Sequence, residues 1–231
     1  MRQDDLQYKQ RAAEEAVEFI DAGMVVGLGH GTTAIFAVRR IAELLKAGSL
    51  KNILGVPCSA QVEEEAVRLG IPLTTLEEHP VIDVTIDGAD EVDPSLDLIK
   101  GAGGALLREK IIAQASHREI IIVDESKMSP VLGTRKELPV EVVPFGLRTQ
   151  IEYLNSVGAR VSVRQAGDGS LFKTDYGNVI LDCAFGPIAQ PALLAARLSE
   201  RAGIVEHGLF LGLATDVIVA GDKGVRHLRR H

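Results

Sequence analysis

VTIDGADEVDPSLDLIKGAGGALLREK, residues 84–110, begins as an apolar strand, passes through a cluster of acids and a glycine-rich turn, and ends in a helical pattern. A strand joined to a helix through a polar, glycine-containing turn is typical of parallel α/β sheets. The polar residues then lie at the carboxyl end of the strand, where open α/β sheets bind ligands. The stretch therefore predicts both a fold class and the position of a site.

Strand-like and helical patterns alternate in the same way on either side of this stretch. The pairs are MVVGLG and TAIFAVRRIAELLK, NILGVPC and AQVEEEAVRLG, VIDVTIDG and GALLREKIIAQA, followed by EIIIVDES. This alternation predicts a parallel sheet covered by helices on both faces. A polar-capped amphipathic helix should precede it, starting at Asp4 or Asp5, ending at Gly23 and burying Leu6, Ala13, Ala16, Val17 and Ile20.

The alternation of strand-like and helical patterns changes after about Pro130. The segments LPVEVVP, FGLRTQIEYLNSVG, RVSVRQ, GDGSLFKTDYGNVILDC, PIAQPALLAARLSERAG and IVEHGLF follow the order β-α-β-β-α-β of a ferredoxin-like unit, and TDVIVAGDKGV returns to the first sheet. We predict an α/β protein with a discontinuous Rossmann-like parallel-sheet domain, residues 1–131 and 207–231. A smaller α+β ferredoxin-like domain, residues 132–206, is inserted as a lid, as a subunit contact through RVSVRQ and VILDC, or as both.

The composition of the chain indicates which classes of protein to expect. The chain has 231 residues, a net charge of -7, 46% hydrophobic residues and no tryptophan, which favours a folded core and disfavours a nucleic-acid surface. We expect a cytoplasmic protein with no membrane partner, because neither a signal-peptide pattern nor an apolar run of ~20 residues occurs. Cys58 and Cys183 lie outside any C-x-x-C motif and are expected to be reduced core thiols.

GLGHGTTA, residues 27–34, ends a predicted strand and opens a helix, which favours a phosphate site. The dinucleotide pattern G-x-G-x-x-G fails at Thr32, and the P-loop signature is absent. Glycines for strand–helix packing and threonines as caps remain the alternative. A second glycine-rich turn, residues 101–104, can add amide donors, since strand-end loops converge at one edge of a parallel sheet.

The acids of DGADEVD allow more than one interpretation. A calcium loop is rejected, because Pro94 occupies the position of the bidentate acid. A solvated acidic turn is favoured for Glu91 and Asp93, whereas Asp87 and Asp90 adjoin the strand end and a Gly88-Ala89 pair that admits a ligand. The six histidines show no paired metal-ligand spacing, and no G-x-S-x-G occurs. Carboxylate acid/base chemistry assisted by a lysine is what remains.

These motifs resemble the ribose-5-phosphate isomerase A family over nearly the whole chain. DGADEVDPSLDLIKGAGGALLREKIIA is the most specific match, and GLGHGTTA, VDESK, LPVEVVPFG, TDYGNVILD and GIVEHGLF follow in the family's order. The resemblance implies an enzyme that interconverts D-ribose 5-phosphate and D-ribulose 5-phosphate in the non-oxidative pentose phosphate pathway. It also implies no metal or organic cofactor and a homodimer or homotetramer.

The same resemblance implies roles for individual residues. Glu109 would be the general base, and Asp87, Asp90 and Lys100 would line the reacting carbons and oxygens. Substrate-binding candidates are Lys9, Gly29, His30, Gly31, Thr32, Thr33, Gly88, Ala89, Gly101, Ala102, Gly103, Gly104 and Lys127. The chain departs from the usual family pattern at His30, normally threonine, and at Ala102, normally glycine, so that substrate affinity is where we expect differences.

The chemistry needs these residue types. The isomerisation moves a proton between two adjacent carbons through an enediolate, so one carboxylate beside both carbons can carry it. A lysine cation beside the developing oxyanion stabilises it. Arg108 is expected to be structural or at a subunit contact. The alternative function is a non-catalytic sugar-phosphate-sensing module, although no basic recognition helix is visible; a CoA transferase or aminosugar-phosphate deaminase is a minor alternative.

Overall fold

A computed structural model describes residues 3–230 of the chain, which form two compact units. Unit 1 comprises the described residues within Met1–Ala89, Arg108–Lys127 and Gly212–His231, and unit 2 comprises Asp90–Leu107 and Met128–Leu211. The segment 132–206, expected as the inserted domain, falls within unit 2, which also takes in residues 90–107. Among the described residues, no helix is both long and apolar enough to cross a membrane.

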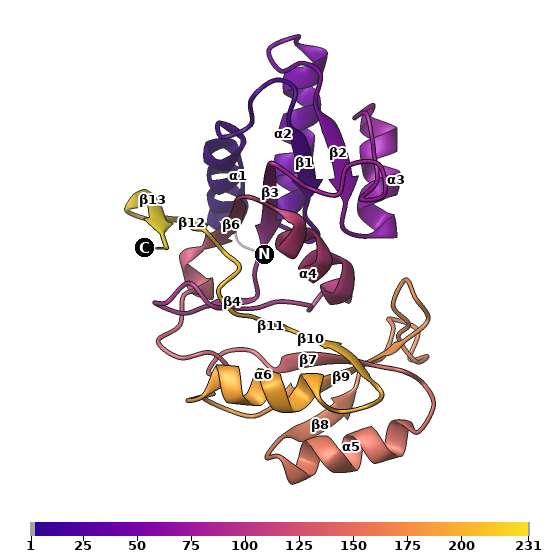
Figure 1. The fold of residues 1–231 in the computed structure, drawn as a ribbon. Helices are drawn as coiled ribbons and strands as arrows, with labels where there is room; N and C mark the ends of the chain where they lie inside the picture. Colours follow the sequence, from indigo (N-terminus) through magenta and orange to yellow (C-terminus); the bar gives the residue numbers. More distant parts are fainter. Residues whose placement is uncertain (1–2, 231) are drawn as a thin grey trace. The chain divides into compact units, whose positions relative to one another are not determined.

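Unit 1 is built on a six-stranded sheet in the order β13-β12-β6-β3-β1-β2 (Figure 1). Five strands are parallel, and β13 runs antiparallel to β12. The chain order reverses at β1, which has β2 on one side and β3 on the other, and ligands bind at such switch points. The strands are β1 Val25–Leu28, β2 Leu54–Pro57, β3 Val84–Gly88, β6 Glu119–Asp124, β12 Asp216–Gly221 and β13 Gly224–Arg229.

Helices cover this sheet. Helix α1 contacts α2, β6 and β12, helix α2 contacts β3, and helix α3 contacts β2 (Figure 1). One buried apolar cluster joins their inner faces to the strands, as the alternation of patterns predicts. The elements are α1 Gln3–Val17, α2 Ala34–Lys46, α3 Ala60–Leu69, α4 Leu106–Ala115 and the 3₁₀ turn η1 Glu125–Lys127.

The first helix departs from expectation at its end. It stops at Val17 rather than at Gly23, and the chain continues through tighter turns in which the amides of Phe19 and Ile20 donate to carbonyls three residues earlier. Ala13, Ala16, Val17 and Ile20 are buried as expected, but Leu6 is 38% exposed. The side chain of Asp4, a predicted cap, lies outside the described residues.

The larger sheet of unit 2 has four antiparallel strands in the order β10-β7-β9-β8. With two helices between them, the strands follow the predicted β-α-β-β-α-β pattern, and a second buried cluster forms their core. VILDC lies in the inner strand β9 and is largely buried, so it is not available as a surface contact, whereas β8 is an edge strand. The elements are β7 Leu138–Val142, α5 Leu147–Ser156, β8 Arg160–Val163, β9 Val179–Ala184, α6 Pro191–Ser199 and β10 Ile204–His207.

Unit 2 also contains a small sheet that the patterns did not predict. Its strands, in the order β11-β5-β4, are Leu209–Phe210, Leu98–Ile99 and Glu91–Val92. The solvated-turn interpretation is therefore wrong for Glu91, which is fully buried and accepts hydrogen bonds from the amides of Gly133, Arg135 and Lys136. Asp93 does form a turn, accepting from the amides of Ser95 and Asp97.

Asp216, the first residue of β12, is the centre of a polar cluster in unit 1. The Arg118 guanidinium donates to both carboxylate oxygens at 2.8 Å, and the hydroxyl of Thr215 and Nε2 of His227 lie at 2.7 and 2.6 Å. Burial by itself would raise the pKa of this carboxyl, but the hydrogen bonds from Arg118, Thr215 and His227 and the Arg118 charge hold the pKa well below its usual value.

We expect Asp216→Asn to lower the free energy of unfolding by about 2 kcal/mol at pH 7, since charge-assisted hydrogen bonds are lost. The folded-state pKa of Asp216 lies below the unfolded value of about 3.9, so its contribution is present above that pH and is lost as the pH falls through the folded pKa. Urea unfolding at pH 7 and pH 3 measures this. The wild-type-to-variant difference should shrink at pH 3; a constant difference would contradict the assignment. Glu152→Gln, which removes an exposed pair with Arg148, is the control and should change little.

Candidate active site

The loops that follow β1, β2 and β3 meet at the carboxyl edge of the sheet in unit 1. Gly29 lies directly against β3, and its amide donates to the carbonyl of Ile86 at 3.0 Å. A Cβ at residue 29 would lie 2.4 Å from Oδ1 of Asp87 and 2.4 Å from that carbonyl oxygen. Glycine is therefore required here for close approach rather than for an unusual backbone angle.

Asp87, within β3, is held by this loop. Its side chain is almost fully buried, and Oδ1 accepts hydrogen bonds from the amides of His30 at 3.0 Å and Gly88 at 2.7 Å. The His30 amide is thus engaged by Asp87 rather than presented to a ligand. The carboxylate consequently has a fixed orientation supplied by the backbone of two strand-end loops.

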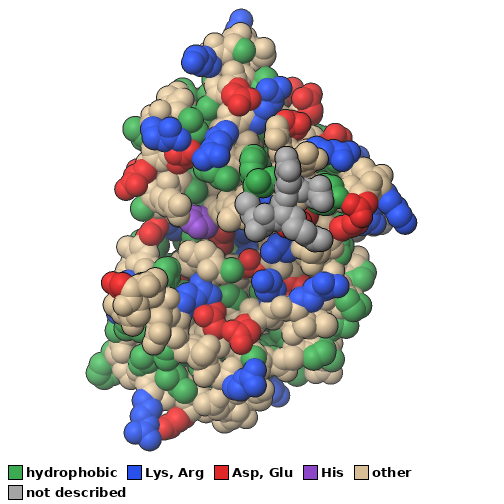
Figure 2. All heavy atoms as spheres, turned by 180° about the vertical axis from the view of Figure 1, so that it is seen from behind, with side chains coloured by type: hydrophobic (Ala, Val, Ile, Leu, Met, Phe, Trp, Pro, Cys, Tyr) green, Lys and Arg blue, Asp and Glu red, His purple; other side chains and the backbone are tan. Residues whose placement is uncertain are grey.

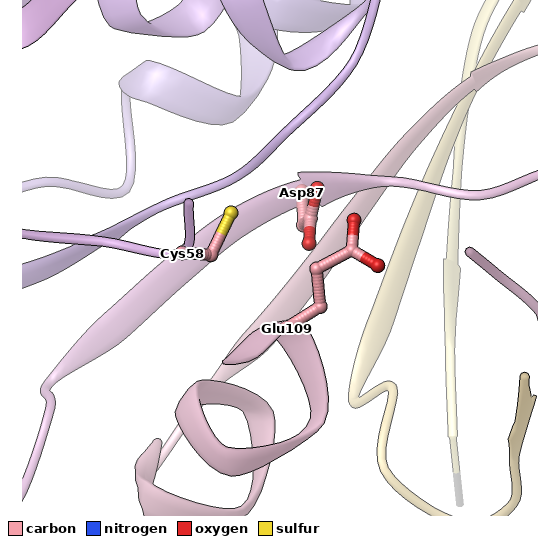
Figure 3. Close-up of side chains that lie close together, drawn as sticks. All are labelled: Cys58, Asp87 and Glu109. Atoms are coloured by element: carbon pink, nitrogen blue, oxygen red, sulfur yellow. The ribbon is translucent and has the colours of Figure 1, made fainter. Parts of the chain in front are cut away.

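Glu109 joins Asp87 from the first turn of α4, where the helix dipole favours an acid. Cys58 approaches from the end of β2, and one ligand atom of each of the three residues lies within 4.8 Å of the others. Figure 3 shows the Asp87 carboxylate between the sulfur of Cys58 and the carboxylate of Glu109. All three side chains are buried. The edge of the sheet therefore carries two adjacent carboxylates in a protein-enclosed environment.

The glycine loop before α2 carries the expected features of an anion site. Lys9, buried on α1, donates from Nζ to the hydroxyl of Thr32 at 2.8 Å. Thr32 is exposed, Thr33 is the N-cap residue of α2, and Gly31 has a φ of +112°. A cation, a hydroxyl and the start of a 13-residue helix thus lie together, and this combination favours phosphate.

The His30 side chain, the first family departure, turns toward the neighbouring helix. Its Nδ1 lies 2.9 Å from the hydroxyl of Ser59, which caps α3 by accepting the amide of Val62 at 3.1 Å. Ser59 was not singled out in the sequence, although a serine directly before a helical run is a known N-cap signal. His30 therefore couples the glycine loop to the start of α3.

The remaining catalytic candidates belong to unit 2. Oδ2 of Asp90 accepts the amide of Ala102 at 2.9 Å, so that this amide of the second glycine turn is engaged within the protein. Lys100 is 2% exposed, and its Nζ lies 5.5 Å from the ring centroid of Phe210. An aromatic face near a buried ammonium stabilises the charge.

Arg164, which the sequence did not single out, holds the second glycine turn. Its Nη1 donates to the carbonyls of Gly101 at 2.8 Å and Ala102 at 3.0 Å, and its Nε donates to Asp182 at 2.9 Å. Gly101 and Gly104 have φ angles of +106° and +81°, which the turn requires. More than sixty residues separate Arg164 from the turn. Only the folded chain reveals the contact.

The remaining residues singled out in the sequence differ in burial and in their contacts. Gly88 and Ala89 are half-buried at the end of β3, Gly103 is exposed, and Lys127 is half-buried at the end of η1. Arg108 is structural, as expected: its Nη2 donates to the carbonyl of Pro57 at 2.9 Å, and its guanidinium lies 3.9 Å from Glu63.

Comparison with known proteins gives one consistent result. The family described as ribose 5-phosphate isomerase A (phosphoriboisomerase A) matches residues 54–224. A relative named ribose-5-phosphate isomerase A from Desulfatibacillum aliphaticivorans is 59% identical over 96% of both chains. A probable ribose-5-phosphate isomerase 2 from Arabidopsis thaliana is 48% identical over 100% of this chain and 89% of its own.

Solved structures that resemble this chain are of the same kind of protein. A D-ribose-5-phosphate isomerase in complex with phospho-erythronic acid is 39% identical, covers 97% of this chain and 98% of its own, and has a TM-score of 0.95. The ribose 5-phosphate isomerase from Plasmodium falciparum has the same identity and coverage, with a TM-score of 0.93.

We expect Gly29→Ala to lower the free energy of unfolding by about 1–3 kcal/mol, because the added methyl must displace Asp87 or β3. Chemical denaturation measures the change. Gly167→Ala is the matched control, since its Cβ would meet nothing within 4 Å. Equal stability of the two variants would contradict the close approach described here.

Proposed function

The chain belongs to the ribose-5-phosphate isomerase A family, and from this premise we propose that Glu109 is the base of its reaction. The protein is an aldose-ketose isomerase that interconverts D-ribose 5-phosphate and D-ribulose 5-phosphate. One observation carries the assignment of the base: Glu109 is a buried carboxylate on a helix, next to a second fixed carboxylate.

Glu109 removes the proton from C2 of the open-chain aldose and returns it to C1, so one carboxylate serves both carbons. Positioned general bases of this kind supply ~10²- to 10⁴-fold of rate. Its place in the first turn of α4 restricts its motion, and burial shields the enediolate from water.

Asp87 orients the sugar hydroxyls and relays the proton between O1 and O2. Two backbone amides hold its Oδ1, so the direction of the carboxylate is set before the substrate arrives. Such prior orientation reduces the entropy lost on reaching the transition state.

Lys100 and Asp90 extend the proposal to unit 2. Lys100 supplies a buried cation for the developing enediolate oxygen, and removing one preorganised donor typically costs about 3–4 kcal/mol. Asp90 helps to line the reacting carbons and anchors the second glycine turn through the Ala102 amide. The turn, Gly101, Ala102, Gly103 and Gly104, presents its remaining backbone to the sugar.

The phosphate end binds at the glycine loop. Lys9, Thr32, Thr33 and the start of α2 provide the positive field, with Gly29, His30, Gly31, Gly88, Ala89 and Lys127 completing the surroundings. This field must be local, because the chain carries a net charge of -7 and Figure 2 shows acidic and basic side chains interspersed on the face in view.

We also propose that the enzyme acts in the cytoplasm, in the non-oxidative pentose phosphate pathway, as a homodimer or homotetramer. Unit 2 is the proposed subunit contact and lid: it carries Phe145, 92% exposed, and Tyr176, 61% exposed. A subunit contact that covered these two side chains would remove apolar surface from water.

The experiment that tests the function is hydrogen exchange at C2 of ribose 5-phosphate in heavy water, with ketose formation measured alongside. Wild-type protein should do both; binding without either would favour the sensor. Glu109→Gln should lower kcat by at least about 100-fold, as loss of a general base does. It should still bind phospho-erythronic acid, the ligand of the solved relative. Glu64→Gln, an exposed acid on α3, is the control, and a Glu109→Gln variant with near-wild-type turnover would contradict the assignment.

Lys9→Met should raise KM by about 10- to 100-fold with little change in kcat, because a charge-assisted hydrogen bond to the phosphate is worth about 1.5–3 kcal/mol. Steady-state kinetics measures both constants. Lys46→Met, at the exposed far end of α2, should leave KM unchanged. A fall in kcat with constant KM would place Lys9 at the reacting carbons instead.

A further inference from the structure

We propose that Cys58, Asp87 and Glu109 form a binding site for a thiophilic divalent cation of the zinc class, and that the bound cation blocks the isomerase. The claim of binding depends only on the geometry of the three side chains. The claim of inhibition rests on the proposed role of Glu109, so the two are tested separately.

The three side chains have the spacing of a metal site. They come from different elements, the end of β2, β3 and α4, and their ligand atoms lie within 4.8 Å of one another. In a tetrahedral zinc site, Zn–S and Zn–O distances of about 2.3 and 2.1 Å place neighbouring donor atoms about 3.4–3.6 Å apart. We expect rotations of the three side chains to close this difference when a cation binds.

The chemistry of the donors selects the ion. Two carboxylates without the thiol would suit a hard cation such as Mg²⁺, whereas a thiolate favours zinc-like ions. Binding of the cation releases the thiol proton of Cys58. The divalent charge then offsets the negative charges of the thiolate and the two carboxylates inside the protein. The hydrogen bonds from the amides of His30 and Gly88 to Asp87 correspond to the outer-shell contacts that orient metal ligands.

The fourth coordination position explains the expected inhibition. Three protein ligands leave one position for water or for a hydroxyl of the sugar. A Glu109 carboxylate coordinated to the cation is no longer able to accept the C2 proton. Cation and sugar phosphate should therefore compete, with the cation raising KM more than it lowers kcat.

Cobalt(II) tests the binding without reference to activity, because cobalt bound to a thiolate absorbs in the near ultraviolet. Wild-type protein titrated with cobalt should develop this band, while Cys58→Ser and Cys58→Ala should lack it. Cys183→Ser is the matched control, since Cys183 is an equally buried thiol, in β9, and burial raises its pKa. A band that persists in both Cys58 variants, or that disappears in Cys183→Ser, would overturn the site.

Zinc inhibition tests the second claim. Zinc should inhibit the wild-type enzyme competitively with ribose 5-phosphate and reversibly on adding a chelator. Cys58→Ser should raise the zinc concentration for half inhibition by at least about tenfold, since even the loss of an outer-shell partner costs 10- to 100-fold in metal affinity. Equal inhibition of wild type and Cys58→Ser would overturn the proposal. A cobalt–thiolate band without any effect of zinc on turnover would overturn the inhibition and count against Glu109 as the base.

Discussion

The passage of the β1 loop across Asp87 is the constraint on which the rest of the site depends. At residue 29 there is no room for a Cβ, so the loop lies directly against β3. That contact allows the amide of His30 to reach Asp87, and it starts the turn that places Thr32 beside Lys9. The Asp87 carboxylate and the glycine loop before α2 are thereby held in fixed relation by backbone atoms, which have less freedom to move than side chains.

The proposed binding of a sugar phosphate by an acidic protein requires local positive charge. Its overall charge repels a sugar phosphate, yet Lys9 and Lys100 are both buried, the first beside a hydroxyl and the second over an aromatic ring. Lysines withdrawn from bulk water act through a lower effective dielectric and are less screened by salt than surface charges are. In the role proposed for each of them, a buried lysine can therefore act locally against a diffuse negative surface.

Much of the fold followed from periodicity, because both units contain long segments whose pattern agrees with their final structure. The parallel sheet and the β-α-β-β-α-β order of unit 2 are confirmed on this basis. Strands β4 and β5 were not predicted because each has only two residues, in a segment rich in acids and proline. Strand β13, GVRHLR, was not predicted because it lacks the apolar character of a typical strand. Two expectations for helix α1 were wrong, since the helix ends at Val17 rather than at Gly23, and Leu6, near its start, is 38% exposed.

Within the site, the glycine-rich and acidic motifs predicted the candidate residues, but they did not predict which other side chains contact them. Ser59, Arg164 and Cys58 contact candidate residues from 29 or more positions away in the sequence, and no local pattern marks such contacts. Helix α1 also makes contacts with residues far away in the sequence. It packs on β12, and Tyr8 hydrogen-bonds Asp222 in the turn after β12. The helix that carries Lys9 therefore depends in part on a strand that lies far from it in the sequence. Local opening of β12 would consequently remove part of the support of the helix that holds Lys9 beside Thr32.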